Sequence, residues 1–194
     1  QALREGLTDL LSAAGHEVVA CEFGKDAVAA GTKTAFDLVL LDLNMPGVQG
    51  FSGLLYLRAQ YPHLPVAIVS ASEDPGTIRR AIDFGASGFV PKSQPVEQIR
   101  TAVQAVLAGD IWTPPEIDIS DVNNSADEEL IARLAKLTPQ QVRVLMMLAE
   151  GLLNKQIAYE LGVSQRTVEI HRARVMEKME ARSLAELVRM QIKT

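Results

Sequence analysis

The chain of 194 residues has one cysteine, three histidines and no long apolar run. A single cysteine, Cys21, cannot form an internal disulfide, which is typical of a reducing compartment such as the cytoplasm. No apolar stretch approaches the roughly 20 residues that a membrane-spanning helix needs, and the first residues lack the apolar core of a secretory signal. The histidines and the cysteine do not cluster in the sequence, so a metal site built from them, His171 included, is not expected. We therefore expect a cytoplasmic globular protein that does not contact a membrane.

The net charge of −5 is unevenly distributed along the chain. Residues 138–194 hold nine Lys and Arg against six Asp and Glu, which gives a net charge of +3. Residues 1–137 hold ten Lys and Arg against eighteen Asp and Glu, which gives −8. An acidic first part joined to a basic tail predicts two modules with different partners.

Helix and strand patterns alternate along residues 1–109, at a spacing typical of βαβ units. We expect helices over residues 2–14, 26–34, 51–61, 75–84 and 95–109. We expect strands over residues 17–23, 38–41, 65–70 and 88–91. The strand at 38–41 is apolar throughout, which indicates burial on both faces of a parallel sheet, and Cys21 is expected to be buried in its own strand. The pattern predicts an α/β, doubly wound first domain.

The alternation stops at residues 110–124, where prolines, acids and asparagines indicate a linker. The rest of the chain has only helical patterns. They cover residues 125–136, 139–150, 154–161, 165–179 and a segment from 183 onward. This order predicts an all-α second domain over residues 125–194, which includes the helix that follows the linker.

Polar side chains follow three of the expected strands, at the point where each strand ends. Asp42 follows the strand at 38–41, Ser70 ends the next one, and Lys92 follows the last. The carboxyl ends of parallel strands form the edge where open α/β sheets bind ligands. A carboxylate, a hydroxyl and an ammonium can together accept a phosphoryl group, because the first attacks and the others stabilise the phosphoryl oxygens. The alternative is that these residues have only structural roles, with Asp42 capping a turn and Lys92 lying in solvent.

Three motifs in residues 1–109 resemble the receiver domain of two-component response regulators. They are LVLLDLNMPG at 38–47, VAIVSAS at 66–72 and GASGFVPKS at 85–93. The resemblance implies a flavodoxin-like receiver in which a sensor histidine kinase phosphorylates Asp42 with the help of Mg²⁺. It also implies that Asn44 offers a backbone carbonyl to the metal, that Ser70 and Phe89 are switch residues, and that Lys92 binds the phosphoryl group.

One feature of that family has no counterpart in this sequence. Receivers begin with an interior strand that ends in an acidic pair, and the chain starts, without a Met, at the helix that would follow this strand. By this resemblance, we expect an interior strand of the sheet and two acidic ligands of Mg²⁺ to be missing from the sequence as given. We expect the metal site of this chain, with Asp42 and Asn44, to be incomplete.

Residues 154–178 have the layout of a helix-turn-helix. Ile157 and Leu161 give the first helix an apolar face, and Gly162 supplies the turn. The second helix carries several cations that could neutralise phosphates while the helix lies in a major groove. The alternative is a small helical bundle with a solvated charged face.

The segment at 137–188, from LTPQQVRV to SLAELV, resembles the four-helix DNA-binding domain of NarL/FixJ (LuxR-type) regulators. The resemblance implies that Glu169, Ile170, Ala173 and Arg172 face the bases of double-stranded DNA. It implies contacts with the DNA backbone from Asn154, Lys155, Ser164, Arg166, Thr167 and Arg174. The last helix would form a homodimer.

Taken together, these features predict a phosphorylation-controlled transcription regulator of a two-component system, and not an enzyme. We expect phosphorylation of Asp42 to switch dimerisation and DNA binding, with the unphosphorylated receiver covering the recognition helix. One alternative is a receiver that acts through protein contacts without phosphorylation. The other is a phosphohydrolase with an aspartate nucleophile, which would need a second acid at the position of Asn44.

Overall fold

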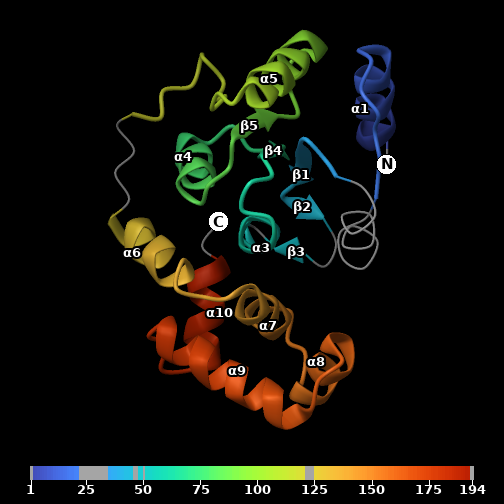
Figure 1. Ribbon diagram of the computed structural model, residues 1–194. Helices are drawn as coiled ribbons and strands as arrows, with labels where there is room; N and C mark the ends of the chain where they lie inside the picture. The colour runs from blue at the N-terminus through green and yellow to red at the C-terminus, as the bar shows by residue number, and fades with distance from the viewer. Residues whose placement is uncertain (1, 22–34, 46–47, 50, 121–124, 193–194) are drawn as a thin grey trace.

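The computed structural model describes residues 2–21, 35–45, 48–49, 51–120 and 125–192. An α/β part comes first in the chain and a helical part follows it, with α6 between them in Figure 1. The α/β part contains α1 (Ala2–Ala13), β1 (Val39–Asp42), α3 (Ser52–Gln60), β4 (Val66–Ser70), α4 (Pro75–Asp83), β5 (Gly88–Pro91) and α5 (Val96–Ala108). The expected helix at 26–34 lies outside the described residues.

The central sheet is parallel, with the strand order β1-β4-β5. Asp42 pairs with Val69 at one junction, and Ser70 pairs with Pro91 at the other. Every residue of β4 is buried, as expected for an interior strand of a parallel sheet. The register brings the ends of the three strands to one edge, so the predicted α/β fold class is confirmed.

A short antiparallel hairpin follows β1 and was not predicted. Its strands are β2 (Asn44–Met45) and β3 (Val48–Gln49), with Asn44 paired to Gln49. Strands of two residues have no periodicity that a sequence pattern could reveal.

The expected strand at 17–23 is wrong for the residues that can be described. Residues 16–21 have no regular structure, and Cys21 is exposed instead of buried. In the flavodoxin-like strand order the second strand pairs only with the first. Residues 2–13 form α1, and among the described residues no strand pairs with residues 18–21.

The helical part contains α6 (Ser125–Leu134), α7 (Pro139–Ala149), α8 (Asn154–Leu161), α9 (Gln165–Lys178) and α10 (Leu184–Ile192). Helix α7 begins with a complete capping box, in which Thr138 accepts from the Gln141 amide and Gln141 accepts from the Thr138 amide. Gly162 ends α8 in the left-handed region, with φ of 65°, which sets the sharp turn into α9. Ile157 and Val168 are fully buried where α8 and α9 pack.

Helix α6 is fastened to the end of α9 by cations. The Arg133 guanidinium lies 2.6 Å from Glu129 on its own helix and 3.2 Å from Glu180, just after α9. The Lys178 ammonium donates to the Lys136 carbonyl at 2.7 Å. These contacts group α6 structurally with the helices that follow it.

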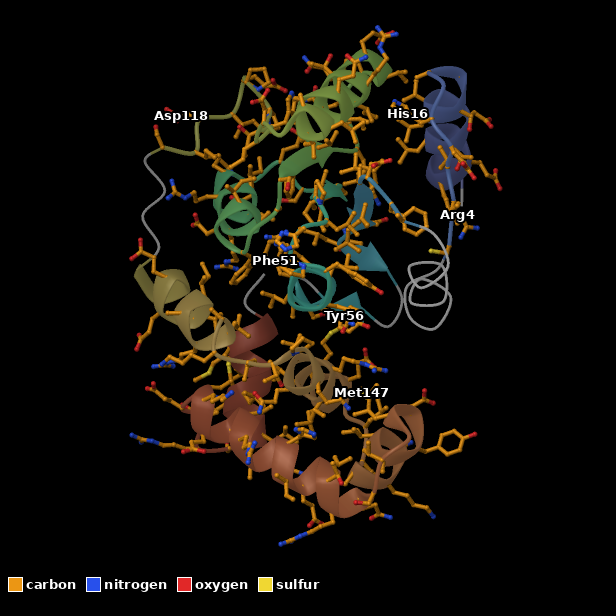
Figure 2. The ribbon with its side chains drawn as sticks, viewed as in Figure 1. Arg4, His16, Phe51, Tyr56, Asp118 and Met147 are labelled. Carbon is orange, nitrogen blue, oxygen red and sulfur yellow. The ribbon has the colours of Figure 1, made fainter. Side chains whose placement is uncertain are left out.

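The two parts of the chain pack together through α3 on α7 and α4 on α6. One cluster of buried apolar side chains runs from the sheet through α3 into the helical part. Tyr56, on α3, lies at this contact (Figure 2) and is only 6% exposed. Burial raises the pKa of the Tyr56 hydroxyl, while the charge of Arg143 on α7 acts in the opposite direction. No described helix is long and apolar enough to cross a bilayer.

Candidate phosphorylation site and DNA-binding surface

Asp42, at the end of β1, is held from two sides. Its Oδ2 lies 2.6 Å from Lys92 Nζ, and its Oδ1 accepts a hydrogen bond of 2.9 Å from the backbone amide of Asn44. The side chains of Asp42 and Lys92 are 30% and 25% exposed, so the pair can be reached from solvent. The ammonium thus lies where it would stabilise negative charge added to this carboxylate. The Asn44 amide was not singled out from the sequence; an Asp that bonds the amide two residues on is the signal that could have found it.

The two expected switch residues are both buried. Ser70, at the end of β4, is 2% exposed, and its hydroxyl accepts a hydrogen bond of 3.2 Å from the Ser72 amide. Phe89, in β5, is fully buried and paired in register with Ile68. In this state the Ser70 hydroxyl bonds the loop between β4 and α4, and the Phe89 ring is in the core.

The described residues do not supply a complete magnesium site. No group of three His, Cys, Asp or Glu side chains among them could hold a metal ion. Magnesium needs an octahedron of oxygen ligands, whereas the residues expected to bind it here are Asp42 and the Asn44 carbonyl. Because Asp42 is also paired with Lys92, this donor set alone does not fit the ion.

Helices α8 and α9 form the expected helix-turn-helix. The Ser164 hydroxyl caps α9 by accepting from the Thr167 amide at 3.1 Å, which orients the start of the second helix. Expected DNA contacts on α9 are exposed at Arg166, Glu169, Ile170, Ala173 and Arg174. Lys155, near the start of α8, is exposed as well. A protruding helix with an exposed mixed surface of this kind suits a DNA major groove.

Two pairs of side chains within this surface were not anticipated from the sequence. Arg172 donates from Nη1 to the Asn154 side-chain oxygen at 3.3 Å, which joins α9 to the first turn of α8. Arg166 lies 3.3 Å from Glu169 on the exposed face of α9. Arg172 is therefore half-buried and directed at α8, whereas Glu169 and Ile170 remain outward. Contacts between separate helices leave no periodic signal in a sequence.

The hypothesis that the receiver covers the recognition helix is wrong for this structure. The receiver packs on α7 and α6, and α9 lies on the far side of the helical part from the sheet (Figure 1). Arg166, with 82% of its side chain exposed, and Ile170, at 44%, are open to solvent. The apolar surfaces of α3 and α7 are buried against each other, and the polar face of α9 offers the receiver no comparable apolar area.

Comparison with known proteins places both parts in described families. Residues 1–104 match the response regulator receiver domain, and residues 135–191 match the luxR family of bacterial regulatory proteins. The chain belongs to the two-component response regulators with a LuxR-type DNA-binding domain. The predicted family and its function class are thereby confirmed.

Several characterised regulators are similar over most of their length. The transcriptional regulatory protein FixJ of Azorhizobium caulinodans is 36% identical, over 97% of this chain and 86% of the relative. The glycerol metabolism activator of Pseudomonas putida is 37% identical, over 81% of this chain and 74% of the relative. The crystal structure of full-length FixJ from B. japonicum matches 97% of this chain and 90% of that one, with a TM-score of 0.50 and 31% identity. The RcsB–DNA complex matches in fold, with a TM-score of 0.55 and 22% identity, over 100% of this chain and 94% of that one.

Proposed function

We propose that this response regulator accepts a phosphoryl group on Asp42 from a sensor histidine kinase. The observation that carries the proposal is the contact of 2.6 Å between Asp42 Oδ2 and Lys92 Nζ at the carboxyl edge of the sheet. An Asp42 oxygen attacks the phosphorus of a phosphohistidine, the phosphorus–nitrogen bond breaks, and the leaving imidazole takes a proton from solvent water. Lys92 stabilises the added charge, and the Ser70 hydroxyl turns from the Ser72 amide to a phosphoryl oxygen.

Receiver domains typically bind Mg²⁺ for phosphorylation. Asp42 and Asn44 are the positions that we assign to the metal, as part of a larger ligand set. Asp42, Lys92 and Ser70 are the residues of this chain that act in the phosphoryl transfer itself. The chain itself is a regulator and not an enzyme under this proposal, because Asn44 is not the acid that phosphohydrolase turnover requires.

The helical domain is proposed to bind double-stranded DNA with α9 in the major groove. Glu169, Ile170 and Ala173 would read bases, and Lys155, Arg166, Thr167 and Arg174 would contact phosphates together with Ser164. We reassign Arg172 and Asn154, because their mutual hydrogen bond suits a role in fixing α8 against α9 at the backbone. The active form would be a homodimer on a two-fold operator. The protein would act in the cytoplasm, where it would encounter both the kinase and DNA.

The proposed domain boundaries follow the same division. The receiver covers residues 1–109, the linker covers 110–124, and the DNA-binding part with its preceding helix covers 125–194. The cations that fasten α6 to the end of α9 support placing α6 in the last of these.

Mass spectrometry after treatment with acetyl phosphate tests the phosphorylation site. We expect an acyl-phosphate adduct on Asp42 in the intact chain and its loss in Asp42→Asn. Asp37→Asn is the matched control, because Asp37 is an exposed acid five positions earlier and should leave the adduct intact. An adduct on another side chain, or none, would overturn the assignment of Asp42. DNA binding that is the same with and without the adduct would favour a receiver that acts without phosphorylation.

A further inference from the structure

The first residues of the linker extend the receiver sheet by a single β-bridge, called here the rung, between Trp112 and Gly88. The Trp112 amide donates to the Ser87 carbonyl at 3.1 Å, and the Trp112 carbonyl accepts from the Phe89 amide at 3.0 Å. Together the two bonds form a parallel bridge between Trp112 and Gly88, on the side of β5 away from β4. The chain thus makes one more crossover between parallel segments, from β5 through α5 to Trp112. The bridge covers a strand edge that would otherwise expose its backbone groups.

Gly88 is the residue that allows the linker to approach so closely. A Cβ at this position would lie 3.1 Å from a methyl of Val106 and 3.3 Å from the Trp112 carbonyl oxygen. Both distances are shorter than ordinary van der Waals contact. A side chain at residue 88 would therefore press on the rung and on α5 at the same time.

The Trp112 side chain packs on the receiver as well. It is half-buried against a small apolar cluster formed by Val90, Ile99 and Ala102, which come from β5 and α5. The Phe89 ring, on the residue that bonds to the Trp112 carbonyl, is fully buried. The backbone of the proposed switch aromatic is thus bonded directly to the start of the linker.

We propose that Trp112 is a positioning residue that ties the linker to β5 and passes movement of Phe89 to the DNA-binding domain. The proposal rests on phosphorylation of Asp42 as the event that moves Phe89. When β5 and the Phe89 ring rearrange, the rung at Trp112 shifts or opens, and the linker and α6 move with it. Neither Trp112 nor Gly88 touches the phosphoryl site in this account.

Hydrogen exchange tests the attachment without any phosphorylation. In the intact chain we expect slow exchange at the Phe89 and Trp112 amides. Gly88→Ala should speed both by about fivefold, the effect of losing one backbone hydrogen bond. Gly6→Ala is the matched control, because no atom lies within 4 Å of the added Cβ. Fast exchange of the Trp112 amide in the intact chain would overturn the attachment.

Trp112 is the one tryptophan of the sequence, so its fluorescence reports the rung directly. We expect acetyl phosphate to shift its emission in the intact chain and to leave Asp42→Asn unchanged. Gly88→Ala should retain the Asp42 adduct and the basal DNA affinity but lose the gain in affinity on phosphorylation, and Trp112→Phe should retain that gain. An adduct without an emission shift would overturn this inference and leave the proposed function standing. An absent adduct would overturn the proposed function. If Gly88→Ala fails to fold, the change in Trp112 emission of the intact chain on phosphorylation decides the inference by itself.

Discussion

Arg172 on α9 donates a hydrogen bond of 3.3 Å to Asn154 at the start of α8, so the two helices of the helix-turn-helix are joined through residues that we predicted to contact DNA. Both residues were expected to contact DNA individually. Their pairing means that each positions the other, and their effects on DNA binding should not be independent.

A double-mutant cycle on this pair tests the coupling. Arg172→Ala and Asn154→Ala should each weaken binding to an operator, and the double variant should cost less than the sum by about 1 kcal/mol, the net value of such a hydrogen bond. Binding is measured for the four proteins at one salt concentration. Additive effects would show that the two side chains act separately. Arg174→Ala combined with Asn154→Ala is the control, since Arg174 is exposed.

Glu169→Gln should change base preference more than affinity. A carboxylate in the major groove accepts from the cytosine amino group, whereas a Gln side chain pairs with adenine. The preferred base at one operator position should change, with a discrimination of about 1–3 kcal/mol. Selection from a randomised operator library measures the change. An unchanged base preference in Glu169→Gln would place the Glu169 side chain outside the groove.

Lys155→Ala should instead weaken binding to all DNA sequences. It should also lower the slope of log affinity against log salt concentration by about 1.

The contact between α3 and α7 should loosen in alkali. Burial raises the pKa of Tyr56 in the folded protein above its ordinary 10.0. Above about pH 10 the folded state therefore binds more protons than the unfolded state, so the free energy of unfolding falls as the pH rises. Tyrosine absorbance and chemical denaturation across this range measure the effect. Tyr56→Phe keeps the ring and removes the ionisable hydroxyl, so its stability should fall less. Equal losses in the two proteins would assign the effect to other groups.

Thr138→Ala should destabilise the helical domain by about 0.5–2 kcal/mol, because the variant loses the side-chain bond to the Gln141 amide in the capping box of α7. Thermal or urea unfolding measures the change. Thr138→Ser keeps the hydroxyl and should stay close to the original stability. Thr101→Ala should have little effect, because Thr101 is an exposed residue inside α5 and its hydroxyl bonds the Glu97 carbonyl.

The sequence predicted the parts of the fold that depend on local pattern. The strands that became β1, β4 and β5 have continuous apolar runs or clear turn residues at their ends, and the side chains of Asp74 and Thr138 cap the helices that follow them. The strand predicted at 17–23 is not formed by its described residues, because a strand needs a neighbour to pair with and no described strand pairs with this segment. Local propensity carries no information on that requirement.

The placement of the site residues followed from topology, whereas their partners did not. Parallel strands place Asp42 and Lys92 on one edge, so their proximity could be expected before the structure. The pairing of Arg172 with Asn154 and the rung at Trp112 depend on side chains and backbone from separate elements. The roles of these residues in phosphoryl transfer and DNA reading stay predictions.

The exposed position of α9 has a consequence for how such a molecule would search a chromosome. With several cations of α9 exposed, an unphosphorylated copy would be able to slide and hop along DNA through transient contacts with phosphates. Phosphorylation by the kinase would then control how long the protein stays bound at its promoter, because it favours dimerisation. It would not need to uncover the recognition helix first.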